Sequence, residues 1–364
     1  MNKQITAIGQ RVGLSKVQSG WEADWQRVSH WLGVGLQYLL DWKRCPLQLP
    51  WAKTWRAWRL GFTPWTYVLY DLEQNCPDHF LSERDQCLRG HRLNGHYDLA
   101  LHNKTIVAGL LKAWGIGQPE YLGRSHLGRF YGPALSLEQL LEDYPETVFR
   151  PATGCGGQGI LIVQRDRVND VPCSRQELLA LLSTLEDLVV TRFQPNAAYA
   201  QAIYPKSCNT LRILTLWDID RDRPYLAACA HRFGRRGCGS LDNFHGGFGG
   251  LCSPVDDEGC LGPALTLEAG RRVTYTHHPD TGSPIAGVRL PGWSRLGEEL
   301  LELAARLSGA PFLGWDLVAQ EDGWACIEVN PNPAVKVWQV HGGLLQDPRS
   351  RRFFQHHGVV AGPR

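Results

Sequence analysis

The spacing of apolar residues predicts a mixture of helices and strands over most of the chain beyond residue 100. Apolar positions recur at helical spacing in residues 105–114 and 295–307. A third helix is predicted over residues 174–185, because Ser174 and Glu177 form a capping box at its start. Apolar runs bounded by turn residues predict strands over residues 147–150, 160–163, 188–190, 210–217, 225–233 and 313–329. The strands do not alternate strictly with helices, so we predict an α+β fold.

The first hundred residues are rich in tryptophan. Eight of the fourteen tryptophans lie before residue 66, and Trp51, Trp55 and Trp58 follow helical spacing. One interpretation is an aromatic platform for a sugar, a nucleobase or a lipid surface. The other is a helical segment that packs its large side chains onto the next domain. The periodic spacing favours this second interpretation.

The composition is that of a globular protein. Of 364 residues, 43% are hydrophobic and 20% charged, which excludes a mostly disordered chain. The formal net charge of +2 gives no reason to expect nucleic acid or an anionic membrane as a partner. No apolar run approaches the roughly 20 residues of a membrane span. The eleven cysteines form no C-x-x-C pair and no secretion signal is visible, so we expect reduced thiols and a cytoplasmic location.

A glycine-rich segment lies between two predicted strands. Residues 150–159 read Arg-Pro-Ala-Thr-Gly-Cys-Gly-Gly-Gln-Gly, which leaves backbone N–H groups free to point at an anion. The glycines are Gly154, Gly156, Gly157 and Gly159. No Gly-Lys-Ser/Thr triplet follows, and the next predicted element is a strand, so this is not a Walker A loop. The segment is compatible with a phosphate cradle and with a plain hairpin turn.

A second candidate site lies on a hairpin near the end of the chain. Residues 321–323 (Glu-Asp-Gly) separate two apolar runs, which is a hairpin signal. If these three residues form the loop, Asp316 lies directly opposite Glu328, and Asn330 shares their face. Facing carboxylates repel each other unless a cation lies between them. Carboxylate and amide oxygens suit Mg²⁺, so the hairpin is a candidate magnesium site.

Two alternatives stay open for this hairpin. On an exposed edge hairpin both acids would be hydrated and hold no metal. A two-residue turn would shift the register and put Asp316 and Glu328 on opposite faces. The three-residue loop also predicts an apolar opposite face suited to a core, made of Leu317, Ala319, Ala325, Ile327 and Val329.

Together these motifs resemble the ATP-grasp superfamily, and most closely its sugar-transfer-associated branch, which is similar to alpha-L-glutamate ligase-like proteins. The resemblance runs from about Lys104 to Gln339. The combination is specific in this order, although each segment alone is weak. The matching segments are residues 103–104, 150–159, 188–190, 207–212, 231–234, 242–243, 246–247, 314–316 and 327–330.

The resemblance implies an ATP-grasp fold, in which two α+β subdomains grip ATP between them. Residues 1–103 would be a helical, Trp-rich N-terminal region. Residues 104–195 would form the central subdomain with the glycine-rich loop, and residues 196–345 the C-terminal catalytic subdomain with the metal-binding hairpin. Residues 346–364 are basic and contain His, and we expect them to be a solvated tail.

The resemblance also implies roles for single residues. Lys104 would reach the nucleotide phosphates, and the glycine-rich loop would close over them. Asp316, Glu328 and Asn330 would hold one or two Mg²⁺ ions. Arg212 and Arg232 would stabilise the transferred phosphoryl group. Further nucleotide contacts are expected from Arg150, Val190 and Arg192, and substrate contacts from Asn209, Asp242, Asn243, His245, Lys336 and Gln339.

Two positions depart from the family pattern. Arg150 stands where a lysine usually precedes the loop, and its planar guanidinium must contact phosphate differently from an ammonium group. Residues 191–194 read Thr-Arg-Phe-Gln, without the glutamate that many members carry near the adenine. Ribose recognition would then use other groups.

The resemblance implies an ATP-dependent carboxylate–amine ligase that forms an amide through an acyl phosphate and releases ADP and phosphate. The expected cofactors are ATP and Mg²⁺, and the expected substrates are small-molecule or peptide-like acids and amines. Two alternatives stay open. One is a phosphotransferase of the same fold acting on a hydroxyl group. The other is a non-catalytic ATP-binding scaffold, whose N-terminal region would bind a protein or glycan partner.

Overall fold

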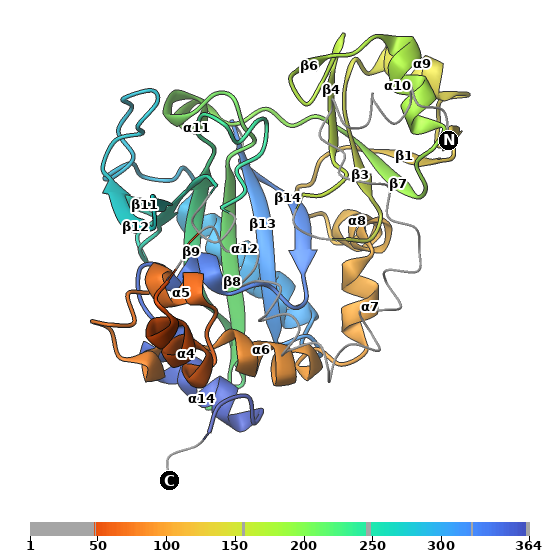
Figure 1. Cartoon of the computed structure of the whole chain (residues 1–364). Coiled ribbons are helices and arrows are strands. Elements are labelled where there is room, and N and C mark those ends of the chain that lie inside the picture. Colours follow the sequence, from red (N-terminus) through yellow and green to blue (C-terminus); the bar gives the residue numbers. More distant parts are fainter. Residues whose placement is uncertain (1–46, 48, 155–156, 245–248, 322, 362–364) are drawn as a thin grey trace.

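The structure is a computed structural model, and it describes residues 47 and 49–361 except for residues 155–156, 245–248 and 322. Two seven-stranded antiparallel sheets form two lobes of unequal size, and helices flank both sheets (Figure 1). The smaller lobe is formed by one continuous segment in the middle of the sequence (Figure 1). This arrangement bears out the α+β prediction.

The strands of each sheet follow a fixed order across it. The small-lobe sheet runs β2 (Arg129–Tyr131), β1 (Tyr121–His126), β7 (Leu188–Arg192), β3 (Glu146–Pro151), β4 (Leu161–Gln164), β5 (Arg167–Val168) and β6 (Val171–Pro172). The large-lobe sheet runs β12 (Arg271–Tyr275), β11 (Ala264–Glu268), β10 (Leu251–Pro254), β9 (Arg223–Phe233), β8 (Thr210–Asp218), β13 (Phe312–Gln320) and β14 (Gly323–Asn330).

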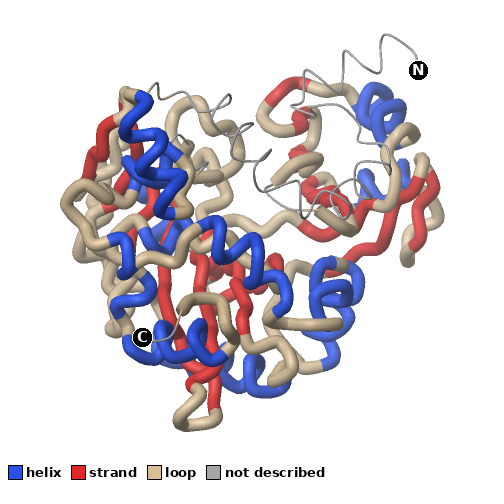
Figure 2. The backbone as a smooth tube through the Cα atoms, turned by 60° about the horizontal axis from the view of Figure 1, so that its bottom comes forward, coloured by secondary structure: helices blue, strands red, loops and turns tan. Residues whose placement is uncertain are grey.

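The helices divide between the same two lobes (Figure 2). Helices α9 (Leu137–Asp143) and α10 (Arg175–Leu182) belong to the small lobe. The others are α4 (Trp51–Leu60), α5 (Pro64–Leu69), η1 (Pro77–His79), α6 (Glu83–Arg89), η2 (Gly90–Arg92), α7 (Tyr97–His102), α8 (Lys104–Ala113), α11 (Ala198–Ile203), α12 (Trp293–Arg306), α13 (Lys336–Gln339), η4 (Leu344–Gln346) and α14 (Pro348–His356).

The small lobe is a sheet covered on one face by two amphipathic helices. Leu140 of α9 and Leu181 of α10 share a core with Phe149 and Val190 of the sheet. Helix α10 begins with the predicted capping box, in which Ser174 and Glu177 satisfy each other's backbone N–H groups. The pairing of β3 with both β4 and β7 places the glycine-rich loop at the end of β3.

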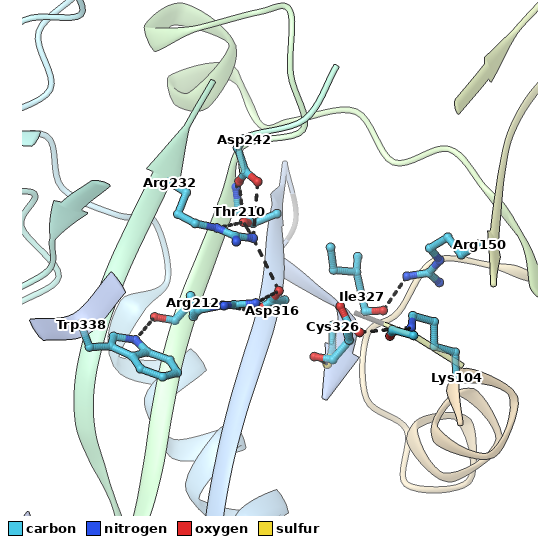
Figure 3. A network of polar contacts seen from close by, with 12 residues as sticks. Lys104, Arg150, Thr210, Arg212, Arg232, Asp242, Asp316, Cys326, Ile327 and Trp338 are labelled. Atoms are coloured by element: carbon cyan, nitrogen blue, oxygen red, sulfur yellow. Dashed lines mark hydrogen bonds and ion pairs between the residues drawn. The ribbon is translucent and has the colours of Figure 1, made fainter. Parts of the chain in front are cut away.

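The large sheet has helices on both of its faces. Along β8 the side chains alternate, so Leu211 and Ile213 pack with α12 and α8, whereas Leu214 and Leu216 pack with the N-terminal helices. Arg212 shares the face of Leu214 but carries a charge. This face is therefore apolar under the N-terminal helices and becomes polar at Arg212, towards the other lobe (Figure 3).

The two ends of the described chain share one core. Phe62 and Tyr70 pack in the same cluster as Phe353 and Phe354 of α14, all four being fully buried. The prediction that residues 346–364 form a solvated tail was therefore wrong for α14. Its two adjacent phenylalanines give the helix an apolar face that covers the sheet.

The tryptophan stripe is a helix, as predicted, but it does not pack as expected. Helix α4 buries Thr54 and Ala57, while Trp51 and Trp55 are 63% and 58% exposed. The large side chains that anchor this region come later, from α5 and the segments that follow it. Within the described residues, no helix is long and apolar enough to cross a membrane, and no cysteine pairs in a disulfide.

Gln339 joins the N-terminal region to the C-terminal segment. Its side-chain oxygen accepts from Leu81 N at 2.8 Å and Leu344 N at 3.3 Å, and its nitrogen donates to Leu81 O at 3.0 Å. The side chain is completely buried. Gln339 was expected to contact substrate; the structure gives it a structural role, because its hydrogen-bonding groups are used within the core.

Gln339→Leu is expected to destabilise the fold by about 2–4 kcal/mol, because it leaves the buried backbone groups of Leu81 without partners. The measurement is the free energy of unfolding in urea. Gln346→Leu, at an exposed position in η4, is the control and should change stability by less than about 0.5 kcal/mol. Equal effects of the two substitutions would contradict this role.

Candidate functional site

The candidate site begins with the hairpin of β13 and β14, whose register differs from the predicted one. Gln320 pairs with Gly323, so the turn has two residues and not the expected three. The pairing continues through Leu317 and Cys326 and then shifts by one residue, so that Asp316 lies opposite Glu328. A β-bulge at Ile327 thus restores the predicted pair, which a two-residue turn alone would have separated.

The bulge also changes which residues enter the core. Trp324, Cys326 and Val329 of β14 pack with the core beneath the hairpin. Ala325 is fully buried, as predicted, but it pairs with Val318 and therefore lies on the face of Asp316 and not on that of Leu317. The half-buried Ile327 is the bulged residue. The prediction was therefore wrong about the face for Ala325 and about core burial for Ile327.

Two arginines from neighbouring strands converge on Asp316. Arg212 donates from Nε to Oδ1 and from Nη2 to Oδ2 of Asp316, both at 2.6 Å, and Arg232 Nη2 lies 3.5 Å from Oδ2 (Figure 3). Burial acts to raise the pKa of the Asp316 carboxyl, but the two guanidinium groups outweigh it and hold that pKa below its usual value. Asp316 is therefore a permanent anion at neutral pH.

Asp242 and Thr210 hold the second arginine in place. Asp242 Oδ2 accepts from the backbone N of Thr210 at 2.7 Å and from its hydroxyl at 2.5 Å. The Thr210 hydroxyl in turn accepts from Arg232 Nη2 at 2.6 Å, and Asp242 Oδ1 lies 3.4 Å from the same nitrogen. Burial raises the pKa of Asp242 despite the nearby Arg232. Asp242, expected to touch substrate, instead orients Arg232.

Lys104 links the β13–β14 hairpin to the glycine-rich loop. Its Nζ lies 3.2 Å from Glu328 Oε1 and donates to the carbonyl of Gly154 at 2.9 Å. Lys104 is the first residue of α8, which Asn103 caps through its side-chain oxygen. The predicted phosphate-binding lysine and the predicted metal ligand are thus brought together by the fold.

A cavity lies between the two lobes beside this lysine. It is lined by Lys104, Arg150, Thr191, Ile327 and Glu328, among others, and its volume is about 10 Å³, room for about one water molecule. Nucleotide binding here would therefore require Lys104 or the lobes to move.

The strand β7 meets this cavity through a residue that sequence reasoning missed. Thr191 lines the cavity, whereas Val190 is fully buried in the small-lobe core and Arg192 is exposed beside Glu120, 3.6 Å away. Val190 and Arg192, the residues predicted to contact the nucleotide, flank this cavity-lining threonine on either side. Strand alternation was the available signal, since an apolar residue that faces the core places its neighbours on the opposite face.

The glycine-rich loop has the conformation that its glycines permit. Gly154, Gly157 and Gly159 have φ values of 125°, 73° and 74°, a region that side chains disfavour. A Cβ atom at Gly157 would lie 2.9 Å from Nδ2 of Asn243. The loop of one lobe therefore reaches the segment around Asn243 of the other. Gly156 and His245, both predicted site residues, lie outside the described residues.

Two further predicted substrate residues have structural partners. The buried Asn209 accepts from Ser207 and Gly234 and donates to the carbonyls of Ala200 and Tyr204, so its amide is fully used. Lys336 lies 3.5 Å from Glu83 and over the ring of Trp65, on the side of the N-terminal helices. The structure does not bring either residue to the cavity.

Trp338 supports the site from the side of the C-terminal segment and was not predicted. Its Nε1 donates to the carbonyl of Arg212 at 3.0 Å, and its ring lies 6.0 Å from the Arg212 guanidinium (Figure 3). A Cβ atom at Gly314 would lie 2.6 Å from Pro333 and 3.2 Å from the Trp338 ring, so the close packing of this segment on β13 needs glycine there. No local sequence pattern marks such a contact.

The donor set on the hairpin suits a hard cation. Asp316, Glu328 and Asn330 share one face, and each carboxylate oxygen of Asp316 keeps acceptor capacity beyond its bond to Arg212. The Asn330 amide nitrogen is buried without a hydrogen-bond partner, and the amide oxygen is the atom of this side chain that could ligate a cation. These residues fit a magnesium ion. Among the described residues, no group of three or more His, Cys, Asp and Glu side chains could hold a metal ion, so the candidate set depends on the amide of Asn330.

Comparison with known proteins gives a family match over most of the chain. The family model described as sugar-transfer associated ATP-grasp matches residues 92–352. Among solved structures, the chain is similar to the D-cycloserine synthetase DcsG (13% identity, 81% of this chain and 82% of that chain, TM-score 0.41) and to a D-alanine–D-alanine ligase from Bacillus anthracis (11% identity, 71% and 69%, TM-score 0.40).

A third solved structure is matched over a smaller share of its own length. It is an ADP complex of N5-carboxyaminoimidazole ribonucleotide synthetase, with 11% identity and a TM-score of 0.34. The match covers 65% of this chain but only 46% of that chain, so the chain spans less than half of the synthetase. Among curated proteins, none matches the sequence significantly.

Proposed function

The chain belongs to the sugar-transfer-associated ATP-grasp family, and from this membership and the site geometry we propose that it is an ATP-dependent ligase joining a carboxylate to an amine. The observation that carries the proposal is the convergence of Arg212 and Arg232 on the acidic hairpin, with Lys104 joining that hairpin to the glycine-rich loop. Cations from three different elements thus surround one acidic face.

In the proposed reaction the γ-phosphoryl group of ATP passes to a substrate carboxylate oxygen and ADP leaves. The amine then attacks the carbonyl carbon of the acyl phosphate, loses a proton and displaces phosphate, which leaves an amide. Such phosphoryl transfer depends on positioning and charge neutralisation more than on covalent help from the protein. The residues of this chain are suited to those two tasks.

The arginines would stabilise charge on the transferred group. The bidentate bond of Arg212 to Asp316 fixes the guanidinium plane, and the Thr210 hydroxyl fixes that of Arg232, so both charges are positioned before substrate arrives. Lys104 would exchange Glu328 for a phosphate oxygen, which frees that carboxylate. Mg²⁺ held by Asp316, Glu328 and Asn330 would neutralise further phosphate charge.

Product analysis tests the proposed function. The protein is incubated with ATP, Mg²⁺ and a panel of amino acids, sugar acids and peptides. Mass spectrometry identifies the products, and the released nucleotide is identified as ADP or AMP. An amide formed in equal amount to ADP supports the ligase. A phosphorylated product formed without an amine would show a phosphotransferase. ATP binding without any turnover would instead favour the scaffold alternative.

Gly157→Ala is expected to weaken ATP binding about tenfold or more, because alanine is strained at φ 73° and its Cβ would press on Asn243. The measurement is the ATP dissociation constant by calorimetry. Gly95→Ala is the matched control, since Gly95 also has a positive φ of 52° but lies in open space outside the loop. Equal ATP affinities of wild type and Gly157→Ala would contradict the phosphate-cradle role.

A further inference from the structure

We propose that Arg150 is a positioning residue, which holds the Ile327 bulge and thereby keeps Glu328 on the same face as Asp316. The proposal concerns the geometry of the hairpin, and it rests on the proposed function only for its effect on metal and nucleotide. It assigns the guanidinium a partner in the opposite lobe, in addition to any phosphate.

Arg150 reaches across from one lobe to the other. It lies on β3 of the small-lobe sheet, and its Nη1 donates to the carbonyl of Ile327 on β14 at 2.6 Å (Figure 3). The two residues are 177 positions apart in the chain. The contact is therefore a direct tie between the strand that leads into the glycine-rich loop and the strand that carries Glu328.

The partner of this bond is the residue that sets the register. Without the extra residue at Ile327, the two-residue turn would place Asp316 opposite residue 327, and Glu328 would point to the core side of the hairpin. A bulge leaves backbone groups outside the regular ladder, and such groups need other partners when they are buried. Arg150 supplies a charged donor to one of them.

β14 is the edge strand of its sheet, and the bulge lies where that edge is covered. Just before the bulge, Cys326 N donates to the carbonyl of Gly117 at 2.8 Å. A side chain at Gly117 would collide with the carbonyl of Trp324, so this segment runs close beside β14. The next residue of the edge strand, Ile327, accepts from Arg150. Two consecutive residues of this edge are therefore hydrogen-bonded, Cys326 to the backbone of Gly117 and Ile327 to the guanidinium.

The geometry gives a reason for arginine at this position. A guanidinium has five donors in a fixed plane, whereas lysine has a single ammonium nitrogen. Nη1 is used by Ile327, while Nε is buried without a hydrogen-bond partner and the side chain lines the cavity with Lys104. Arginine can therefore hold the bulge with one nitrogen and present its other nitrogens, in a fixed plane, to a ligand.

The test compares Arg150→Lys and Arg150→Met with the wild-type chain. The first measurement is hydrogen exchange of the peptide covering residues 325–329, without ligands. We expect at least tenfold faster exchange in both variants, confined to that peptide and to residues 115–118. Arg192→Lys is the matched control, because Arg192 is an exposed arginine of the same sheet, and its exchange should equal that of wild type.

The second measurement is the affinity for Mn²⁺, by electron paramagnetic resonance, in the presence of saturating ADP. Arg150→Lys should weaken it about tenfold, because Glu328 is no longer held opposite Asp316. Circular dichroism and gel filtration show whether each variant folds. If Arg150→Met fails to fold, Arg150→Lys alone tests the proposal, because it retains the positive charge.

Several results would overturn the proposal. If ADP affinity falls while exchange at residues 325–329 is unchanged, Arg150 is a nucleotide contact only. If exchange rises throughout both lobes, its role is general stability. If wild type forms no amide while the local exchange effect is present, the proposed function fails and the positioning role stands, so the two failures are distinguishable.

Discussion

Glu328→Gln is expected to lower Mg²⁺-dependent ATP turnover at least a hundredfold while leaving the fold intact. The substitution keeps the shape and one side-chain oxygen but removes the charge that would face the cation. Glu328 is 22% exposed at its side chain, and its ion pair with Lys104 spans 3.2 Å at the margin of the cavity. The loss of such a partly exposed pair costs about 1 kcal/mol of stability at most.

The measurement is ATP turnover as a function of Mg²⁺ concentration, together with the unfolding midpoint. Glu302→Gln provides the control, because Glu302 is an exposed glutamate on α12, away from the hairpin. It should leave both quantities unchanged. Near-normal turnover in Glu328→Gln at all Mg²⁺ concentrations would contradict the assignment of Glu328 as a magnesium ligand.

Asp316→Asn is a poorer test of the same site, for a reason visible in the structure. Asp316 is buried and accepts both bonds of the Arg212 fork, with Arg232 at 3.5 Å. Removing one partner of a buried charge pair costs about 3–5 kcal/mol. Lost turnover in this variant would mix a missing metal ligand with a disturbed fold. The sequence gives Asp316 and Glu328 the same predicted role. Substitution of Glu328 tests that role alone, whereas substitution of Asp316 also affects stability.

The fold was largely predictable because its elements carry local signals. The capping box at Ser174 and the periodic helix over 295–307 appear where expected, and the ATP-grasp fold implied by the resemblance is confirmed. The N-terminal region was predictable only in part. A tryptophan stripe marks a helix but not its buried side, and in α4 the buried side chains are Thr54 and Ala57.

The pairing of Asp316 with Glu328 was predicted correctly from an incorrect loop. The sequence indicates a hairpin, but the turn has two residues and the bulge at Ile327 compensates. A bulge has no local signature here, because its partner Arg150 comes from the other lobe. The predicted outcome was right because both routes leave the two acids facing each other.

Two of the predicted substrate residues are buried polar side chains whose hydrogen-bonding groups are used inside the protein. Asn209 and Gln339 read as candidate substrate contacts in a linear sequence, yet both satisfy backbone groups inside the protein. Sequence alone does not distinguish a polar side chain that closes a core from one that awaits a ligand. The distinction depends on partners that only the folded chain supplies.

Arg212→Ala is expected to slow phosphoryl transfer by about a hundredfold or more while changing ATP affinity only a few-fold. The guanidinium is fixed by Asp316 and by the neighbouring Trp338, so it is poised to stabilise developing charge and not to capture the nucleotide. The substitution also removes one partner of the buried Arg212–Asp316 pair, so folding is checked first by circular dichroism. Single-turnover rates and the ATP dissociation constant of the folded variant then separate the two effects. Arg223→Ala, at an exposed position of β9, should change neither.

The same variant makes a prediction about pH. In the wild type the two guanidinium groups hold the pKa of Asp316 below its usual value, although burial acts to raise it. That carboxylate therefore contributes stability at pH above about 4, and the contribution is lost as the pH falls through the lowered pKa. Because Arg212 is the largest of the influences that lower this pKa, its removal is expected to raise the pKa of Asp316.

Because the pKa of Asp316 is expected to rise in the variant, the stability difference between wild type and Arg212→Ala should be larger at pH 7 than at pH 4. At pH 7 the variant must either bury a poorly paired carboxylate or protonate it, and both cost free energy. Near pH 4 protonation of the variant's carboxylate costs little, so the difference should be smaller there, while wild type keeps its own contribution until the pH falls through the lowered pKa. Urea unfolding at both pH values measures the difference. An equal difference at pH 7 and pH 4 would show that Arg212 does not control the charge of Asp316.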